Sequence, residues 1–196
     1  LHPRVRRQRQ MCIRDRFYYD NVVVPGGLYA YWAKLLPQIA ASTASLKSFC
    51  PEAGFTASGF AKMFGCLGAA LAFYSTAKPE KKKKVFALLL PITLTAIVCG
   101  VTEPIEFTFL FVAPMLFVVH AFLAATLATT MWLAGIVGIN SGGLIEIASL
   151  NLIPLMRNHW QQYLLELVIG LIFTAIWFVV FRFLILKFDF KTPGRE

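Results

Sequence analysis

Long apolar runs separated by short polar segments dominate the pattern of this chain. Residues 85–101 and 107–145 contain no Asp, Glu, Lys or Arg. A third run, residues 163–186, is interrupted only by Glu166 near its start and Arg182 near its end. At such end positions a charged side chain reaches the membrane surface at little cost. Because a helix needs roughly 20 apolar residues to cross the hydrocarbon, the pattern predicts an all-α polytopic membrane protein.

Two other segments are less regular. Residues 54–74 combine four glycines and several alanines with a single cation, Lys62. Small residues let helices approach closely, and the glycine breaks predict a helix that enters the membrane without crossing it in one regular piece. An ordinary span with Lys62 near the interface fits the same residues. Residues 18–50 mix Pro, Gly, Trp and Tyr, which predicts a loop and then a short amphipathic or re-entrant helix.

Composition agrees with a membrane location. Hydrophobic residues make up 58% of the chain, charged residues 15%, and the mean hydropathy is +0.65, values too apolar for a soluble domain. The net charge of +9 comes from short basic clusters rather than from a basic face studded with aromatic residues, so nucleic acid is not an expected partner. By the positive-inside tendency, the lysine run 78–84 and the C-terminal tail would both face the cytoplasm, although a merely solvated charge run is the alternative.

The two ends differ from the rest of the chain. Residues 1–16 are polar and arginine-rich and lack an apolar core, so we interpret them as a non-native segment rather than a signal peptide. Residues 187–196 end in Thr-Pro-Gly and charged residues, which is typical of a linker. Residues 17–186 would then form a membrane domain. The four cysteines show no CxxC spacing, and we expect neither a metal nor a cofactor.

Two carboxylates interrupt the apolar sequence in GVTEPIEFTFLFVAP, residues 100–114. Gly100 and Pro104 predict that one helix ends and another begins there. Glu103 and Glu106 have the spacing of a capping box, so they would at least cap the new helix. A broken helix at membrane depth is tolerated only against protein or a water-filled cavity, where carboxylates accept hydrogen bonds from hydroxyl groups. The pattern therefore also predicts a site for a neutral polyol.

The same stretch resembles a known family. GVTEPIEFTFLFVAPMLFVVHAFLAA resembles the signature of the membrane-embedded IIC component of the phosphoenolpyruvate-dependent sugar phosphotransferase system, in the glucose superfamily. FGCLGAALAFYSTAKPEKKKK, NSGGLIEIASLNLIP and the tail TPGRE agree with it. YYDNVVVPGG and FAKMFGCLG are most similar to the maltose and α-glucoside branch. The resemblance covers nearly all of residues 17–196.

The resemblance implies a multi-pass sugar permease of the bacterial cytoplasmic membrane that works as a homodimer. Residues 17–186 would form part of its IIC transport domain, with broken or re-entrant helices, and residues 187–196 would begin the linker to a IIB domain. The partners would be the sugar, the lipid bilayer, a IIB phosphocysteine donor and the upstream phosphotransferase proteins. None of this chain's cysteines has the context that the donor requires, so the chain would carry no catalytic residue of its own.

The resemblance also gives candidate sugar ligands. In the family the first glutamate of the TEP block binds sugar hydroxyls, which corresponds to Glu103 here, and its neighbours Thr102 and Glu106 together with His120 complete the candidate set. On a helix that begins at Pro104, Glu103 lies at the break, so we expect it to be the ligand and Glu106 to be chiefly structural. A lone histidine on an apolar helix is more often hydrogen-bonded to a neighbouring helix.

Two other functions fit the residues taken alone. An ion-coupled secondary transporter would use Glu103 and Glu106 to bind a proton or sodium ion. A non-transporting membrane scaffold would use the same carboxylates only as caps. Glu146, which follows a glycine pair, and the neutral Asn140 and Ser141 are weaker candidates for lining a cavity.

Overall fold

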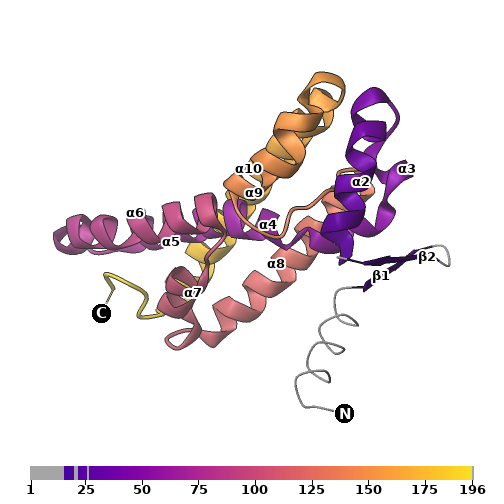
Figure 1. Cartoon of the computed structure of the whole chain (residues 1–196). Helices are drawn as coiled ribbons and strands as arrows, with labels where there is room; N and C mark the ends of the chain where they lie inside the picture. The colour runs from indigo at the N-terminus through magenta and orange to yellow at the C-terminus, as the bar shows by residue number, and fades with distance from the viewer. Residues whose placement is uncertain (1–15, 20–21, 26, 196) are drawn as a thin grey trace, which may run out of the picture.

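The computed structural model describes residues 16–19, 22–25 and 27–195, which are predominantly helical (Figure 1). The helices are α2 Gly27–Ala41, α3 Leu46–Phe49, α4 Ser58–Phe60, α5 Cys66–Thr76, α6 Lys82–Cys99, α7 Glu103–Leu110, α8 Pro114–Leu133, α9 Leu144–Ile147 and α10 Ile153–Lys187. Shorter turns are the 3-10 helices Pro51–Thr56 and Pro79–Lys81 and the π-helical turns Ala61–Gly65 and Ala148–Leu152. The expected all-α class is confirmed.

A short β-hairpin is the exception among the described residues. Strand β1, Arg16–Tyr19, pairs antiparallel with β2, Val22–Pro25, before α2 begins. The expectation of a loop here was wrong, because the aromatic and β-branched residues of both segments favour extended backbone. The non-native segment expected at residues 1–16 lies outside the described residues except for Arg16.

Within the part of the chain that the structure describes, two helical stretches are long and apolar enough to cross a membrane, Pro114–Leu133 and Leu144–Lys187. The apolar run 107–145 is therefore not one helix. Pro114 opens α8, and Gly135, with φ of 83°, follows its end, so the run is divided among the end of α7, helix α8, a loop and the start of α9. In the third run Arg182 is exposed as expected, but Glu166 is only 7% exposed, so the expectation that its side chain reaches the membrane surface was wrong.

Small residues allow close packing between α10 and the segment that leads into α5. A Cβ atom added at Gly65 or Gly68 would collide with the Trp177 side chain, and one at Gly170 would collide with Phe64. The glycines therefore let the helix backbones approach each other, as the sequence predicts. Residues 54–74 also begin irregularly, through a 3-10 helix, α4 and a π-helical turn, which confirms that they do not form one regular helix.

The predicted break between α6 and α7 is confirmed, and it lies against a second break in the chain. Helix α6 ends at Cys99, and Gly100 follows with φ of 75°, in the left-handed region that favours glycine. A Cβ atom added at Gly143, just before α9, would collide with the Gly100 backbone nitrogen and the Val98 carbonyl. Two interruptions far apart in the sequence are thus in direct backbone contact.

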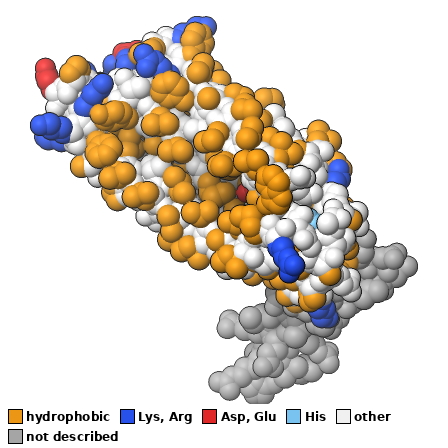
Figure 2. Space-filling view, turned by 90° about the horizontal axis from the view of Figure 1, so that it is seen from above, with side chains coloured by type: hydrophobic (Ala, Val, Ile, Leu, Met, Phe, Trp, Pro, Cys, Tyr) orange, Lys and Arg blue, Asp and Glu red, His pale blue; other side chains and the backbone are white. Residues whose placement is uncertain are grey.

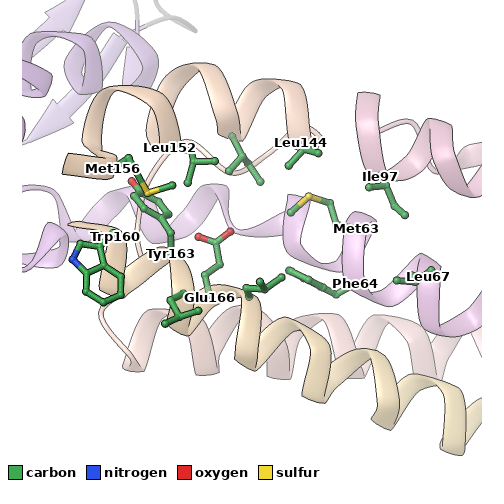
Figure 3. Close-up of a pocket in the computed structure, with 13 residues that line it drawn as sticks. Met63, Phe64, Leu67, Ile97, Leu144, Leu152, Met156, Trp160, Tyr163 and Glu166 are labelled. Carbon is green, nitrogen blue, oxygen red and sulfur yellow. The ribbon is translucent and has the colours of Figure 1, made fainter. Parts of the chain in front are cut away.

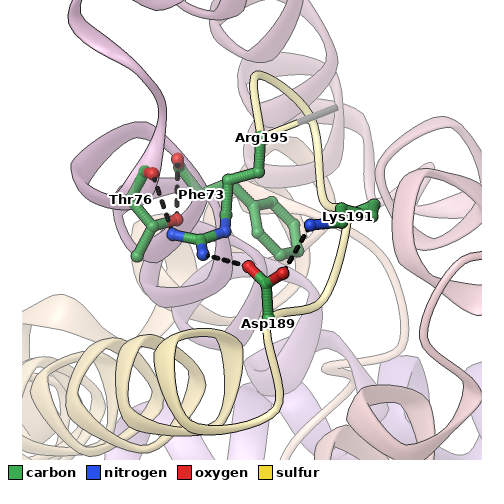
Figure 4. Close-up of polar contacts among 5 residues, drawn as sticks. All are labelled: Phe73, Thr76, Asp189, Lys191 and Arg195. Carbon is green, nitrogen blue, oxygen red and sulfur yellow. Dashed lines mark hydrogen bonds and ion pairs between the residues drawn. The ribbon is translucent and has the colours of Figure 1, made fainter.

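The C-terminal tail folds back onto the corner between α5 and α6 (Figure 4). The Lys78 amide donates to the Gly194 carbonyl at 3.0 Å, and the Arg195 guanidinium donates to the Thr76 carbonyl at 3.4 Å. Asp189 accepts hydrogen bonds from Lys191 and Arg195 at 2.5 and 2.6 Å. The start of the lysine run and the tail therefore lie side by side, and that both face the cytoplasm stays a prediction.

Candidate functional site

A cavity of about 480 Å³ lies where three parts of the chain meet. They are the irregular segment 51–65, the start of α7 and the middle of α8. Small residues make up much of its wall, which leaves room for a ligand. Its polar lining residues come from three separate segments: Ser58, Lys62, Thr102, Glu106 and His120. Three of the four candidate ligands, all except Glu103, thus line one cavity.

Glu106 and His120 face each other in this cavity. Glu106 Oε1 lies 4.0 Å from His120 Nε2. On the other side of the ring, the Trp177 indole donates a hydrogen bond of 3.1 Å to His120 Nδ1. A neutral imidazole that accepts at Nδ1 carries its proton on Nε2, so the network assigns an N–H donor that points toward the Glu106 carboxylate.

The histidine is held rigidly. Its ring contacts Phe109, Phe117 and Phe181 as well as Trp177, with ring centroids 5.5–6.5 Å apart. The expected hydrogen bond to a neighbouring helix is confirmed, since Trp177 belongs to α10. Aromatic walls on several sides fix the orientation of the Nε2–H group before any ligand arrives.

Glu103 occupies a different environment. It is the first residue of α7 and is exposed, while Thr102 precedes the helix and is buried. Among the described residues, neither Glu103 nor Glu106 hydrogen-bonds through its carboxylate to an amide of α7, so the capping-box interpretation was wrong. The first turn is closed by backbone instead, because the Glu106 amide donates to the Thr102 carbonyl at 2.9 Å.

The sequence leaves two positions open for Lys62, the membrane interface or an irregular helix within the membrane. It lies in the π-helical turn Ala61–Gly65 and lines the same cavity as Glu106 and His120. Turns of this kind are frequent at functional sites because they displace a side chain from the regular helical register. The signal in the sequence was a lone cation in a glycine-broken apolar segment, but only the fold brings it opposite α7 and α8.

The cavity therefore combines complementary hydrogen-bonding groups. Lys62 and the His120 Nε2–H donate, Glu106 accepts, and the hydroxyls of Ser58 and Thr102 do either. Small side chains separate these groups, so a ligand with several hydroxyl groups would find both donors and acceptors around it. This is the chemistry that recognises a neutral sugar.

Comparison with known proteins gives the family. The family described as "Phosphotransferase system, EIIC" matches residues 22–125, just over half of the 196-residue chain. The chain belongs to this family. The resemblance seen in the sequence is thereby confirmed, and so is the assignment to the membrane component of the system.

The names of several relatives state the sugar for which they are specific. Over 180 residues the EIIC chain is 57% identical to the "PTS system maltose-specific EIICB component" of Bacillus subtilis and 56% identical to the "PTS system alpha-glucoside-specific EIICB component" of Leptotrichia buccalis, covering 92% of this chain and 34% of each relative. It is 47% identical over 136 residues, 68% of this chain and 20% of the relative, to the "PTS system glucose-specific EIICBA component" of Staphylococcus carnosus. The chain thus spans about a third of the length of the first two relatives.

The weaker candidates of this EIIC chain, Asn140, Ser141 and Glu146, lie in or beside the loop before α9, and their hydrogen bonds stabilise it. The Tyr29 hydroxyl donates to Glu146 at 2.7 Å, and the same carboxylate accepts from the Gly142 amide. The Asn140 carbonyl accepts from the Gly59 amide at 2.6 Å, and its side-chain oxygen accepts from Asn151 at 2.8 Å. These contacts tie the loop before α9 to α2 and α4, and none of the three weaker candidates lines the Glu106 cavity.

Proposed function

We propose that this EIIC chain supplies the sugar-binding part of a phosphotransferase permease that transports maltose or a related α-glucoside and couples uptake to phosphorylation. The observation that carries the proposal is the cavity in which Lys62, Glu106 and His120 converge. The proposed sugar is taken from the names of the maltose-specific and alpha-glucoside-specific relatives, which are 57% and 56% identical over 92% of the chain.

The proposed division of labour assigns binding to this chain and phosphoryl transfer to another domain. Glu106 accepts from sugar hydroxyls, while the His120 Nε2–H and Lys62 donate, so the acceptor hydroxyl is held in a defined orientation. A phosphocysteine on a IIB domain, the B part that the relatives' names contain, donates the phosphoryl group. The charged sugar phosphate then does not return through the hydrocarbon. The working protein is a multi-pass homodimer in the bacterial cytoplasmic membrane.

The cavity also refines the assignment of the two glutamates. The resemblance gives the sugar contact to Glu103, whereas the geometry favours Glu106, which lines the cavity beside His120. We propose Glu106 as the principal carboxylate ligand and Thr102 as a hydroxyl ligand from the same break. Membership of the EIIC family does not support the ion-coupled transporter that was the main alternative.

The test compares carboxylates in the full-length permease that carries this chain. Glu106→Gln keeps the shape of the side chain and removes the charge-assisted acceptor, so we expect maltose affinity to fall about ten- to a hundredfold, as for the loss of about 1.5–3 kcal/mol. Glu103→Gln should change affinity less. Glu80→Gln, in the exposed lysine loop, is the matched control and should bind maltose normally.

Maltose binding is measured by isothermal titration calorimetry, and phosphorylation is followed with phosphoenolpyruvate and the upstream proteins. A larger loss in Glu103→Gln than in Glu106→Gln would return the ligand role to Glu103. Uptake that continues without any phosphoryl donor would reject the phosphotransferase function itself.

A further inference from the structure

A second cavity, also of about 480 Å³, lies on the other side of the turn that carries Lys62 (Figure 3). Met63, Phe64 and Leu67 form one wall, and Leu144, Ile147 and Leu152, from α9 and the turn after it, form the opposite wall. No residue lines both this cavity and the one that contains Glu106. The second cavity is therefore a separate site, and its walls are almost wholly apolar.

One carboxylate points into this apolar space. Glu166, on α10, lines the cavity and is only 7% exposed. Among the described residues it has no hydrogen-bond or ion-pair partner. The Tyr163 hydroxyl, one helical turn earlier, is likewise buried without a hydrogen-bond partner. Buried polar groups in membrane proteins are normally paired, since an unpaired one is costly in hydrocarbon, so the Glu166 carboxylate in the lining of the cavity points to a missing ligand.

The cavity opens through apolar side chains. Trp160, Leu164 and Leu167 line it and are each about half exposed. Figure 2 shows a broad apolar face of the molecule that is hollowed near its middle, with an acidic side chain visible among the apolar ones. A ligand would therefore enter from an apolar phase and reach the carboxylate at the inner end.

We propose that this second cavity binds an amphiphile with a primary amine at one end and a hydrocarbon chain behind it. The ammonium group would pair with Glu166, while the hydrocarbon would lie along Met63, Phe64 and Leu67. The lining contains no Lys or Arg. A fatty acid would bring a second carboxyl group to Glu166 with no cation nearby, so fatty acids are excluded as ligands of the inner end.

A cavity of this size also argues for a small ligand rather than a covering helix. Sites for small molecules enclose about 300–1,000 Å³, with mostly apolar walls and a few polar groups that orient the ligand. Glu166 is the one acidic residue in the lining of this cavity, so it would set the position of the polar end. This inference does not depend on the proposed sugar transport.

The experiment uses the full-length permease in a detergent without a sugar headgroup and three probes of equal chain length. Dodecylamine, dodecanol and dodecanoate are titrated, and the melting temperature and the dissociation constant are measured. We expect saturable binding of dodecylamine, weaker binding of dodecanol and no binding of dodecanoate. Glu166→Gln should weaken dodecylamine binding roughly tenfold or more.

Two further variants keep the test informative. Leu164→Trp narrows the mouth and should reduce amine binding although the carboxylate is intact, which covers the case in which Glu166→Gln fails to fold. Glu80→Gln is the matched control and should bind the amine normally. Equal binding of all three probes, or unchanged amine binding in Glu166→Gln, would reduce the cavity to a nonspecific apolar site and overturn the proposal. No binding of any probe would also overturn it and indicate that another segment of the permease fills the cavity.

Discussion

The two cavities of this EIIC chain have similar volumes and share one short turn, yet they differ in chemistry. Lys62 lines the cavity with Glu106 and His120, whereas the next two residues, Met63 and Phe64, line the cavity with Glu166. Each cavity holds a glutamate, but only the first also has a cation and an imidazole in its lining. A carboxylate in an apolar sequence thus signals a site, and the elements packed opposite decide which ligand the site takes.

The contact between Gly100 and Gly143 joins the two cavities and should give the largest effect when broken. Thr102, just after the first glycine, lines the Glu106 cavity, and Leu144, just after the second, lines the Glu166 cavity. Gly143→Val would force a side chain into the Gly100 backbone. We expect a loss of about 3 kcal/mol or more, measured as a fall in melting temperature and in the yield of folded protein.

The control for this variant is Ser149→Val, at an exposed position in the turn that follows α9. It should keep near-normal stability. Normal stability in Gly143→Val would mean that the backbones of the two breaks are not in contact and that the cavities are independent.

Lys62 and Met63 are consecutive but line different cavities, so substitutions at the two positions should affect maltose affinity differently. Lys62→Met removes a donor from the Glu106 cavity and should lower maltose affinity about tenfold, as for a lost charged hydrogen bond. Met63→Leu, a volume-conserving change in the Glu166 cavity, should leave maltose affinity unchanged. Calorimetric titration of both variants in the full-length permease checks this. A smaller loss for Lys62→Met than for Met63→Leu would contradict the assignment of the two cavities.

The unpartnered state of Glu166 predicts an effect on stability. Glu166→Leu replaces a buried carboxylate by an apolar side chain, so the free energy of unfolding without ligand should rise by about 1–3 kcal/mol. Maltose affinity should be unaffected. Melting curves in a detergent that lacks amines measure the change, with Glu80→Leu as the exposed control. A clear loss of stability would show that Glu166 is already paired within the intact permease.

The C-terminal tail lies outside both cavities and should give the smallest effect. Hydrogen bonds from Lys191 and then from Arg195 lower the pKa of Asp189 below its ordinary value (Figure 4). A lowered carboxylate pKa contributes stability that is present above the ordinary value of about 3.9 and is lost as the pH falls through the lower value in the folded protein.

The measurement is a melting curve between neutral and strongly acidic pH for the wild type and for Asp189→Asn. The wild type should be slightly more stable at neutral pH, and the difference should shrink below about pH 4. Maltose affinity should match in the two proteins. A difference that grows on acidification would contradict the proposed clamp.

Much of the helical plan could be predicted from sequence. The apolar runs gave the membrane class, the pair Gly100 and Pro104 gave the break before α7, and the glycines of residues 54–74 gave the irregular entry into α5. Local chemistry is enough for such features, because a missing amide hydrogen, a left-handed turn or an apolar run acts through neighbouring residues. The β-hairpin was missed because its strands are short and lie within a segment whose turn residues predicted a loop.

The partners of each site residue could not be predicted in the same way. The sequence by itself determined the family, the membrane character and a break flanked by carboxylates, since these depend on residue types close together along the chain. Only the tertiary structure decided that Lys62 lines one cavity with Glu106 and His120, that Glu103 is exposed, and that Glu166 is buried in a second cavity. These outcomes depend on how close glycines allow α5, α6 and α10 to pack, and close packing joins residues that are far apart in the chain.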